Sequence, residues 1–97
     1  MTAIFHLSAQ LEFEEALEGY REQGWDLANS FKRAVQEASS DIEQFPEAYP
    51  VEFTPLVRRK NVERFPYYLA YVIEPDAIAI IAVAHVRRQP LYWIRRV

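Results

Sequence analysis

Residues 67–84 read YYLAYVIEPDAIAIIAVA and predict the centre of a β-sheet. Two nearly continuous apolar runs, 67–73 and 77–84, flank the turn sequence EPD at 74–76. Runs of this kind on either side of a tight turn are typical of two consecutive strands. Because neither run alternates apolar with polar residues, both strands are expected to be buried on both faces.

The segments that precede this pair predict one more strand and a loop. Residues 57–64 are expected to form a strand, which Phe65-Pro66 separates from the next one. Residues 46–55 (PEAYPVEFTP) contain three prolines and show no periodicity, so they are expected to form a loop. This loop is too short to separate two domains.

Two amphipathic helices are predicted before the loop. The first follows a short opening strand at residues 3–7, with Ser8 as its cap, and Gly24 supplies its C-terminal stop. The second is expected to start at the N-cap Asp26 and to end at Pro46. Its apolar stripe consists of Leu27, Phe31, Ala34, Val35, Ala38, Ile42 and Phe45. We therefore expect the order β-α-α-β-β-β, an α+β fold in which a helical hairpin packs on a small antiparallel sheet.

Length and composition limit the kind of protein. With 97 residues, 51% hydrophobic and 14% aromatic, the chain is expected to form one domain over residues 1–97. It has no cysteine, no apolar run long enough to span a bilayer and no signal peptide, which together fit a cytoplasmic protein. The only glycines, Gly19 and Gly24, form no phosphate-binding loop, and the only histidines, His6 and His85, lack metal-ligand spacing. We expect no metal, no cofactor and no membrane association.

The net charge of -3 conceals a division along the chain. Residues 1–52 carry 3 basic and 11 acidic side chains, whereas residues 53–97 carry 8 basic and 3 acidic ones. The two parts therefore have net charges of -8 and +5. The acidic part coincides with the predicted helices and the basic part with the predicted sheet and tail. The average charge argues against an anionic partner, but the charge of the basic part is compatible with one.

The first group of candidate functional residues lies on the strand predicted at 57–64. Alternation along a strand places Arg58, Lys60 and Arg64 on one face and Arg59 on the other. The same charges also suit an edge strand that is merely protected from aggregation, with no role in binding.

The second group lies at the end of the chain. Four arginines follow the last strand and are interleaved with two aromatic residues: Arg87, Arg88, Arg95, Arg96, Tyr92 and Trp93. Arginine beside aromatic rings suits phosphate contact and base stacking. His85 lies where the buried strand meets this tail, and it is either a general acid or base or a histidine that hydrogen-bonds to the backbone. His6 is expected to be structural.

Four motifs occur in order in the second half of the chain. They are Arg64-Phe65-Pro66-Tyr67, then Tyr71, then Ala82-Val83-Ala84-His85, then Arg87-Arg88-Gln89-Pro90-Leu91-Tyr92-Trp93, with the spacing continued to Arg96. With the length and the element order, they resemble the RelE/ParE superfamily of toxins from type II toxin–antitoxin systems, in particular its ParE-like "plasmid stabilisation" branch. The resemblance implies a toxin that is neutralised by a cognate antitoxin protein encoded beside it. The antitoxin would wrap the helical hairpin and the sheet edge.

The resemblance also implies a choice between two macromolecular targets, and no small-molecule substrate. RelE-like members cleave mRNA on the ribosome without a metal, whereas ParE-like members poison DNA gyrase. RelE-like sites are typically richer in lysine, and this chain has only Lys32 and Lys60. That difference favours a ParE-like toxin that inhibits growth through DNA gyrase. The alternatives are a ribosome-dependent mRNA endoribonuclease and an inactive homologue that only binds its antitoxin.

Roles follow from position in the motifs. The candidates for catalysis in a ribonuclease are Arg64, His85, Arg88 and Tyr92. Such an enzyme needs groups that stabilise the phosphorane charge and activate the ribose 2′-OH. The residues expected to bind the target or a nucleic acid are Arg58, Arg59, Lys60, Arg87, Trp93, Arg95 and Arg96.

Overall fold

The computed structural model describes all 97 residues, Met1–Val97. The elements in chain order are β1 (Ala3–Phe5), α1 (Leu7–Gln23), α2 (Trp25–Gln44), β2 (Val51–Phe53), β3 (Val57–Asn61), β4 (Tyr67–Ile73), β5 (Ile78–His85) and a short 3-10 helix, η1 (Ile94–Arg96). The predicted α+β class and the predicted order are confirmed, with one strand more than expected, because β2 lies in the segment predicted to be a loop. None of the helices is long and apolar enough to cross a membrane.

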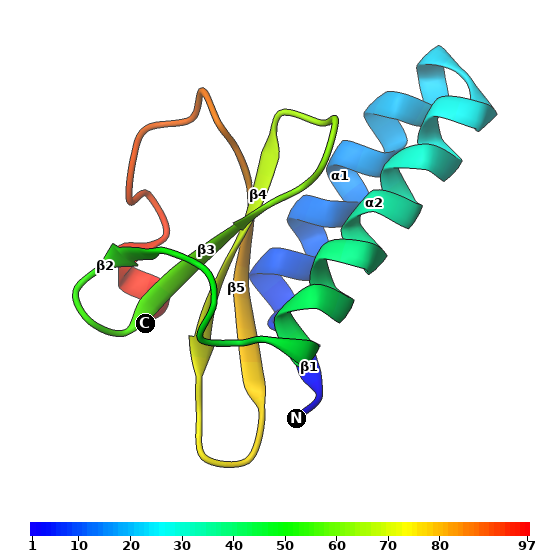
Figure 1. The fold of residues 1–97 in the computed structure, drawn as a ribbon. Helices are drawn as coiled ribbons and strands as arrows, with labels where there is room; N and C mark the ends of the chain where they lie inside the picture. The colour runs from blue at the N-terminus through cyan, green and yellow to red at the C-terminus, as the bar shows by residue number, and fades with distance from the viewer.

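The strands form one sheet in the order β1-β5-β4-β3-β2 (Figure 1). β1 runs parallel to β5, and all other neighbours are antiparallel. β4 and β5 are buried along most of their length, as their apolar runs predict. β2 has only three residues and pairs with β3. A strand this short depends on its partner more than on its own sequence, so the absence of periodicity in residues 46–55 did not reveal it.

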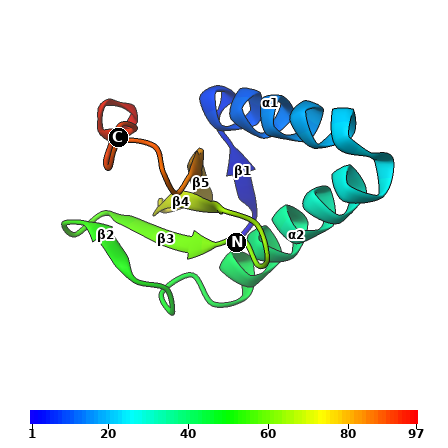
Figure 2. The same ribbon diagram turned by 90° about the horizontal axis from the view of Figure 1, so that it is seen from above.

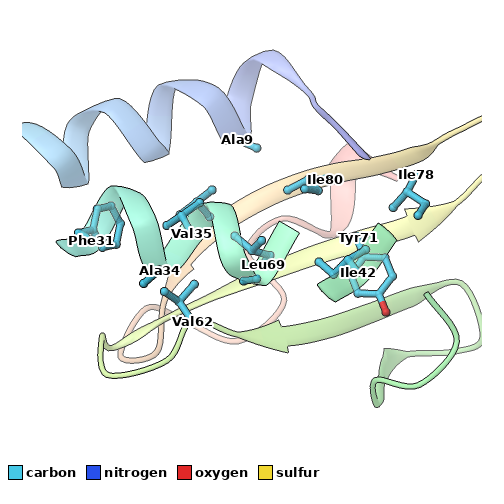
Figure 3. Close-up of a cluster of buried hydrophobic side chains, with 12 residues drawn as sticks. Ala9, Phe31, Ala34, Val35, Ile42, Val62, Leu69, Tyr71, Ile78 and Ile80 are labelled. Carbon is cyan, nitrogen blue, oxygen red and sulfur yellow. The ribbon is translucent and has the colours of Figure 1, made fainter. Parts of the chain in front are cut away.

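The helices form a hairpin that meets at Gly24 and packs on the sheet (Figure 2). Gly24 has a φ of 157°, a conformation that L side chains rarely adopt, so the predicted stop is confirmed. α2 directs Phe31 and Ile42 into a buried cluster with Leu69 and Tyr71 of β4 (Figure 3). This cluster is the main core between the hairpin and the sheet.

The ends of the helices differ from the prediction. α1 starts one residue before Ser8 and α2 one residue before Asp26, so both residues lie inside a first turn and neither caps its helix. On α2, Leu27 and Phe45 are exposed, and Ala28 is buried instead of Leu27. Leu27 lies in the first turn and Phe45 lies beyond the last one. The apolar periodicity of a helix does not show where the sheet that covers its apolar side ends, so residues at the two ends of the stripe can be exposed.

Residues 86–97, which we call the C-terminal segment, return across the face of the sheet that lies away from α2 (Figure 2). Trp93 is fully buried there, in a second cluster that includes Tyr68, Ala70 and Ile81. Its indole N–H donates a hydrogen bond to the Tyr68 hydroxyl at 2.9 Å. Both faces of the central strands are therefore covered, one by the hairpin and one by the C-terminal segment.

A bulge in β5 changes which of its residues face the helices. Where β5 pairs with β4, Ile81 is an extra residue between Ile80 and Ala82 and has no partner. Ile80 belongs to the cluster on the helix side, and after the bulge Val83 belongs to it. His85, two residues further on, therefore lies on the side of α1 as well. Bulges commonly re-aim side chains in this way.

Candidate functional site

Glu12 of α1 lies at the centre of the site, and its side chain is only 14% exposed. Its carboxylate accepts hydrogen bonds from the hydroxyl of Tyr92 at 2.7 Å and from the backbone N–H of Val83 at 3.0 Å. The guanidinium of Arg96 donates two more, at 2.8 and 3.0 Å, and that of Arg88 donates a longer one at 3.3 Å. We call this group the Glu12 clasp. It joins α1 to β5 and to three side chains of the C-terminal segment.

The clasp also completes the edge of β5. β1 pairs with β5 only as far as Ile80, so the rest of that edge has no neighbouring strand. There the Glu12 carboxylate accepts from the N–H of Val83, and Arg96 donates to the carbonyl of Ile81 at 2.9 Å. Backbone groups at a strand edge need partners, and here two oppositely charged side chains supply them.

Tyr92 is held as a neutral hydrogen-bond donor. Burial raises the pKa of its phenol, and the hydrogen bond to Glu12 raises it further. The guanidinium of Arg88 lies over its ring, 3.8 Å from the centroid. The hydrogen bond to Glu12 is also the main reason why the pKa of Arg96 is raised. The cations and the carboxylate therefore satisfy one another inside the folded chain.

A groove of about 430 Å³ lies beside the clasp, between α1 and the ends of β4 and β5. Its lining consists of Glu12, Glu15, Ala16, Gly19, Tyr20, Gln23, Tyr67, Val83, His85 and Arg88. The ring of His85 meets that of Tyr67 edge-on at 5.1 Å. Burial raises the pKa of the Tyr67 phenol, and the nearby Tyr20 and Glu15 add to the effect.

His85 forms the backbone hydrogen bond that was one of its two predicted roles. Its Nδ1 accepts from the N–H of Arg87 at 3.0 Å. A neutral imidazole that accepts at Nδ1 carries its proton on Nε2. In this arrangement Nδ1 of His85 is occupied by the backbone.

The three basic residues of β3 are engaged within the fold. Arg58 donates to the carbonyls of Glu47 and Tyr49, at 3.0 and 2.8 Å. Arg59 stacks on Tyr68 with its guanidinium 3.9 Å from the ring centroid, and it pairs with Glu52 at 3.6 Å. Lys60 pairs with Asp41 of α2 at 3.7 Å. These contacts hold β2, the preceding loop and α2 against β3, which is a structural role.

The structure places the remaining candidates in two very different settings. Trp93, predicted to bind the target, is fully buried, so a partner could not touch it while the C-terminal segment stays docked. We correct that assignment, because the ring fills the cover of the sheet. The side chains of Arg64, Arg87 and Arg95 are exposed and take part in no ion pair or hydrogen bond. Arg88 is exposed as well, with its side chain 55% exposed, but it is paired with Glu12.

The alternation along residues 57–64 predicted that Arg64 shares a face with Arg58 and Lys60. The structure contradicts this prediction. β3 ends at Asn61, and Arg64 lies in the turn before β4 with a φ of 70°. This turn is joined to the start of the C-terminal segment by a hydrogen bond from the N–H of Val86 to the carbonyl of Pro66, at 2.9 Å. Arg64 and Arg87 therefore belong to the same end of the sheet.

Glu12 was not singled out from the sequence, because it is one of several glutamates on the first helix. One signal was present. Glu12 lies three residues after Ala9 and four before Ala16, which are on the buried side of α1. A carboxylate at helical spacing with buried residues needs a partner on the same side.

The fold and the site define a class of small α+β proteins that carry an arginine-rich segment docked on a sheet. Six chains of solved structures are similar to this one. One is from the "Chromosomal ParDE TA system from P. aeruginosa", with a TM-score of 0.66 and 18% sequence identity over 88% of this chain and 95% of that chain. At this identity the likeness concerns the fold.

The family follows from the sequence. The family model for the ParE toxin of the type II toxin–antitoxin system parDE matches residues 3–90. The chain therefore belongs to the ParE toxin family. Residues 91–97, which include Tyr92 and Arg96 of the clasp, lie outside this match. No curated protein sequence matches the chain.

Proposed function

We propose that this protein is the toxin of a type II toxin–antitoxin pair of the plasmid-stabilisation kind, and that it inhibits growth by binding DNA gyrase in the cytoplasm. The observation that carries the proposal is the position of Glu12. Its carboxylate occupies the point at which Arg88, Tyr92 and Arg96 would have to meet a phosphate. A phosphate at this point would lie against the Glu12 carboxylate, and the two negative charges would repel each other.

This arrangement favours a protein target over phosphodiester cleavage. Cleavage needs cations that stabilise the developing phosphorane charge and a base that activates the 2′-OH. Here the guanidinium groups of Arg88 and Arg96 are paired with the Glu12 carboxylate, and Nδ1 of His85 already accepts a backbone hydrogen bond. Arg64, Arg87 and Arg95 remain exposed and suit contacts with an acidic protein surface.

The proposed antitoxin has suitable surfaces to cover. Leu7, Leu11 and Trp25 of the hairpin are 73%, 54% and 68% exposed. Val51 and Phe53 are exposed on β2, which is the edge strand of the sheet. These exposed apolar residues lie at separate places on the hairpin and on the sheet edge, so an antitoxin that covers them would extend over several elements.

The test uses the purified full chain and the same chain expressed inducibly in bacteria without a neighbouring antitoxin gene. We expect arrested growth, inhibition of DNA supercoiling by gyrase and intact mRNA. The double variant Arg87→Gln, Arg95→Gln should lose inhibition at least about tenfold. Arg33→Gln, which changes an exposed arginine of α2, is the matched control and should act like the wild type.

A substitution of His85 distinguishes gyrase inhibition from ribonuclease activity. His85→Gln should leave gyrase inhibition within about twofold of the wild type, whereas it would abolish a ribonuclease that uses the imidazole. Cleaved mRNA with normal supercoiling would refute the gyrase proposal in favour of the endoribonuclease. Normal growth despite good expression would instead favour a homologue that only binds its antitoxin.

A further inference from the structure

The C-terminal segment is attached to the rest of the molecule almost entirely by side chains. Its backbone hydrogen bonds connect near neighbours, such as Arg88 N–H to His85 and Ile94 N–H to Leu91. Only the N–H of Val86 reaches another element, at Pro66. A segment with so few backbone contacts to its support relies on other anchors to keep one position.

The segment is held by two kinds of side-chain contact, apolar packing on the sheet and hydrogen bonds to Glu12. Trp93 fills the cover of the sheet, and Leu91, Tyr92 and Ile94 pack against the same cluster. Glu12 contacts three side chains that are spread along the segment, Arg88, Tyr92 and Arg96. Hydrogen bonds are directional, so contacts at three points along the segment fix its rotation more sharply than apolar packing alone does.

We propose that Glu12 is the positioning residue of the C-terminal segment and sets the direction in which Arg87 and Arg95 face the target. This inference rests on the proposed function, since that function assigns Arg87 and Arg95 to target binding. It adds a partner on α1 to the Tyr92 and Arg96 positions of the C-terminal motif.

The charge of Glu12 is essential to this role. The carboxylate receives hydrogen bonds from two guanidinium groups, one hydroxyl and one backbone N–H. Glutamine has nearly the same size, but its NH₂ group would face the guanidinium groups as a second donor. Aspartate is shorter, but it keeps the charge, and the long side chains of Arg88 and Arg96 can follow it. A comparison of the two variants therefore shows whether the charge or the size of the side chain at position 12 holds the segment.

The position of the segment is measured by hydrogen exchange of the amides of residues 88–96 and by acrylamide quenching of Trp93. Trp25→Phe serves as the background for quenching, because it leaves Trp93 as the only tryptophan. In Glu12→Gln we expect these amides to exchange at least about tenfold faster and Trp93 to be quenched more strongly. Glu12→Asp should change less. Glu22→Gln is the matched control on α1, because Glu22 is exposed and takes part in no hydrogen bond or ion pair.

Activity is measured as growth arrest at matched expression, with tryptophan 25 in place. Glu12→Gln should weaken the arrest at least about tenfold while the far-UV circular dichroism stays native, and Glu12→Asp should restore most of it. If Glu12→Gln kept both the exchange rates and the toxicity of the wild type, Glu12 would not position the segment. If Glu12→Asp were worse than Glu12→Gln, size and not charge would be decisive, and the proposal would be wrong.

Failure of this inference is distinguishable from failure of the proposed function. A wild-type chain that neither arrests growth nor inhibits gyrase refutes the function and the positioning role together. A toxic wild type whose Glu12→Gln variant exchanges faster but is equally toxic refutes the positioning role alone.

Discussion

The two tryptophans of this chain provide a direct test of how the C-terminal segment is held. Trp93 is fully buried, whereas Trp25 is 68% exposed at the start of α2. We expect Trp93→Ala to cost a large part of the stability and Trp25→Ala to cost little. The comparison is informative because the amino acid and the substitution are the same in both cases.

The magnitude follows from burial. An aromatic side chain buries about 150–250 Å², which at about 25 cal/mol per Å² corresponds to roughly 4–6 kcal/mol. Measured changes of this kind cost about 3–5 kcal/mol. The hydrogen bond from the indole to the buried Tyr68 hydroxyl is lost as well, for about 1 kcal/mol. We therefore expect about 4 kcal/mol for Trp93→Ala, a large share of the roughly 5–15 kcal/mol of a small domain.

The assay is urea unfolding at 25 °C, followed by far-UV circular dichroism. Trp93→Phe should cost only about 1–2 kcal/mol, because most of the apolar contact remains and chiefly the hydrogen bond is lost. Trp25→Ala should cost about 1 kcal/mol at most, mainly from its contact with the Arg21 guanidinium, 5.2 Å from the ring. A cost for Trp93→Ala as small as that for Trp25→Ala would show that the segment is not docked in solution and would refute the reasoning.

Three further substitutions test other parts of the structure. Arg64 adopts a φ of 70°, which glycine adopts without strain. In thermal unfolding, Arg64→Gly should therefore be neutral or stabilising by up to about 1 kcal/mol. The same variant should weaken growth arrest if the guanidinium contacts the target. Burial raises the pKa of Tyr71 to about 12, so its contribution is complete below pH 10 and is lost as the pH rises towards 12. The difference in unfolding free energy between the wild type and Tyr71→Phe should therefore shrink by roughly 1.4 kcal/mol per pH unit above pH 10, and a constant difference would contradict it. Glu43 accepts a hydrogen bond from the Ala3 N–H at 2.7 Å. Glu43→Ala should therefore lower the free energy of unfolding by about 1–2 kcal/mol and speed the hydrogen exchange of that amide. Unchanged exchange would count against this contact.

The central strands were predictable because their signal is local. β4 spans Tyr67–Ile73 as the sequence predicted, and β5 is displaced by one residue from the prediction. The bulge at Ile81 was not predictable from an apolar run, since every residue around it is apolar and the register depends on the pairing with β4. Without the bulge, alternation would direct His85 away from α1. A site that contains His85 could therefore be predicted only with the register of β5 known.

The site was less predictable than the fold, and sequence distance explains why. Arg88 and Tyr92 were recognised from a motif that lies within a few residues. Their partner Glu12 is 76 and 80 residues away, and Arg96 is 84 residues away from it. Trp93 was misassigned for the related reason that an aromatic residue in a basic tail suits a binding surface and a core equally well. Only the return of the chain across the sheet decides between them.

The division of charge along the chain has a different meaning in the folded molecule. Three carboxylates of the acidic helices bind the sheet and the C-terminal segment: Glu12 in the clasp, Asp41 on Lys60 and Glu43 on the N–H of Ala3. Part of the opposite charge of the two parts is therefore paired within the protein, where it attaches the hairpin to the sheet and the C-terminal segment. On the basic side, a partner meets exposed arginines that include Arg64 and Arg87 at one end of the sheet and Arg95 on the C-terminal segment. Neither the total charge nor the charge of each half describes this surface, because both include arginines that are paired with carboxylates of the same chain.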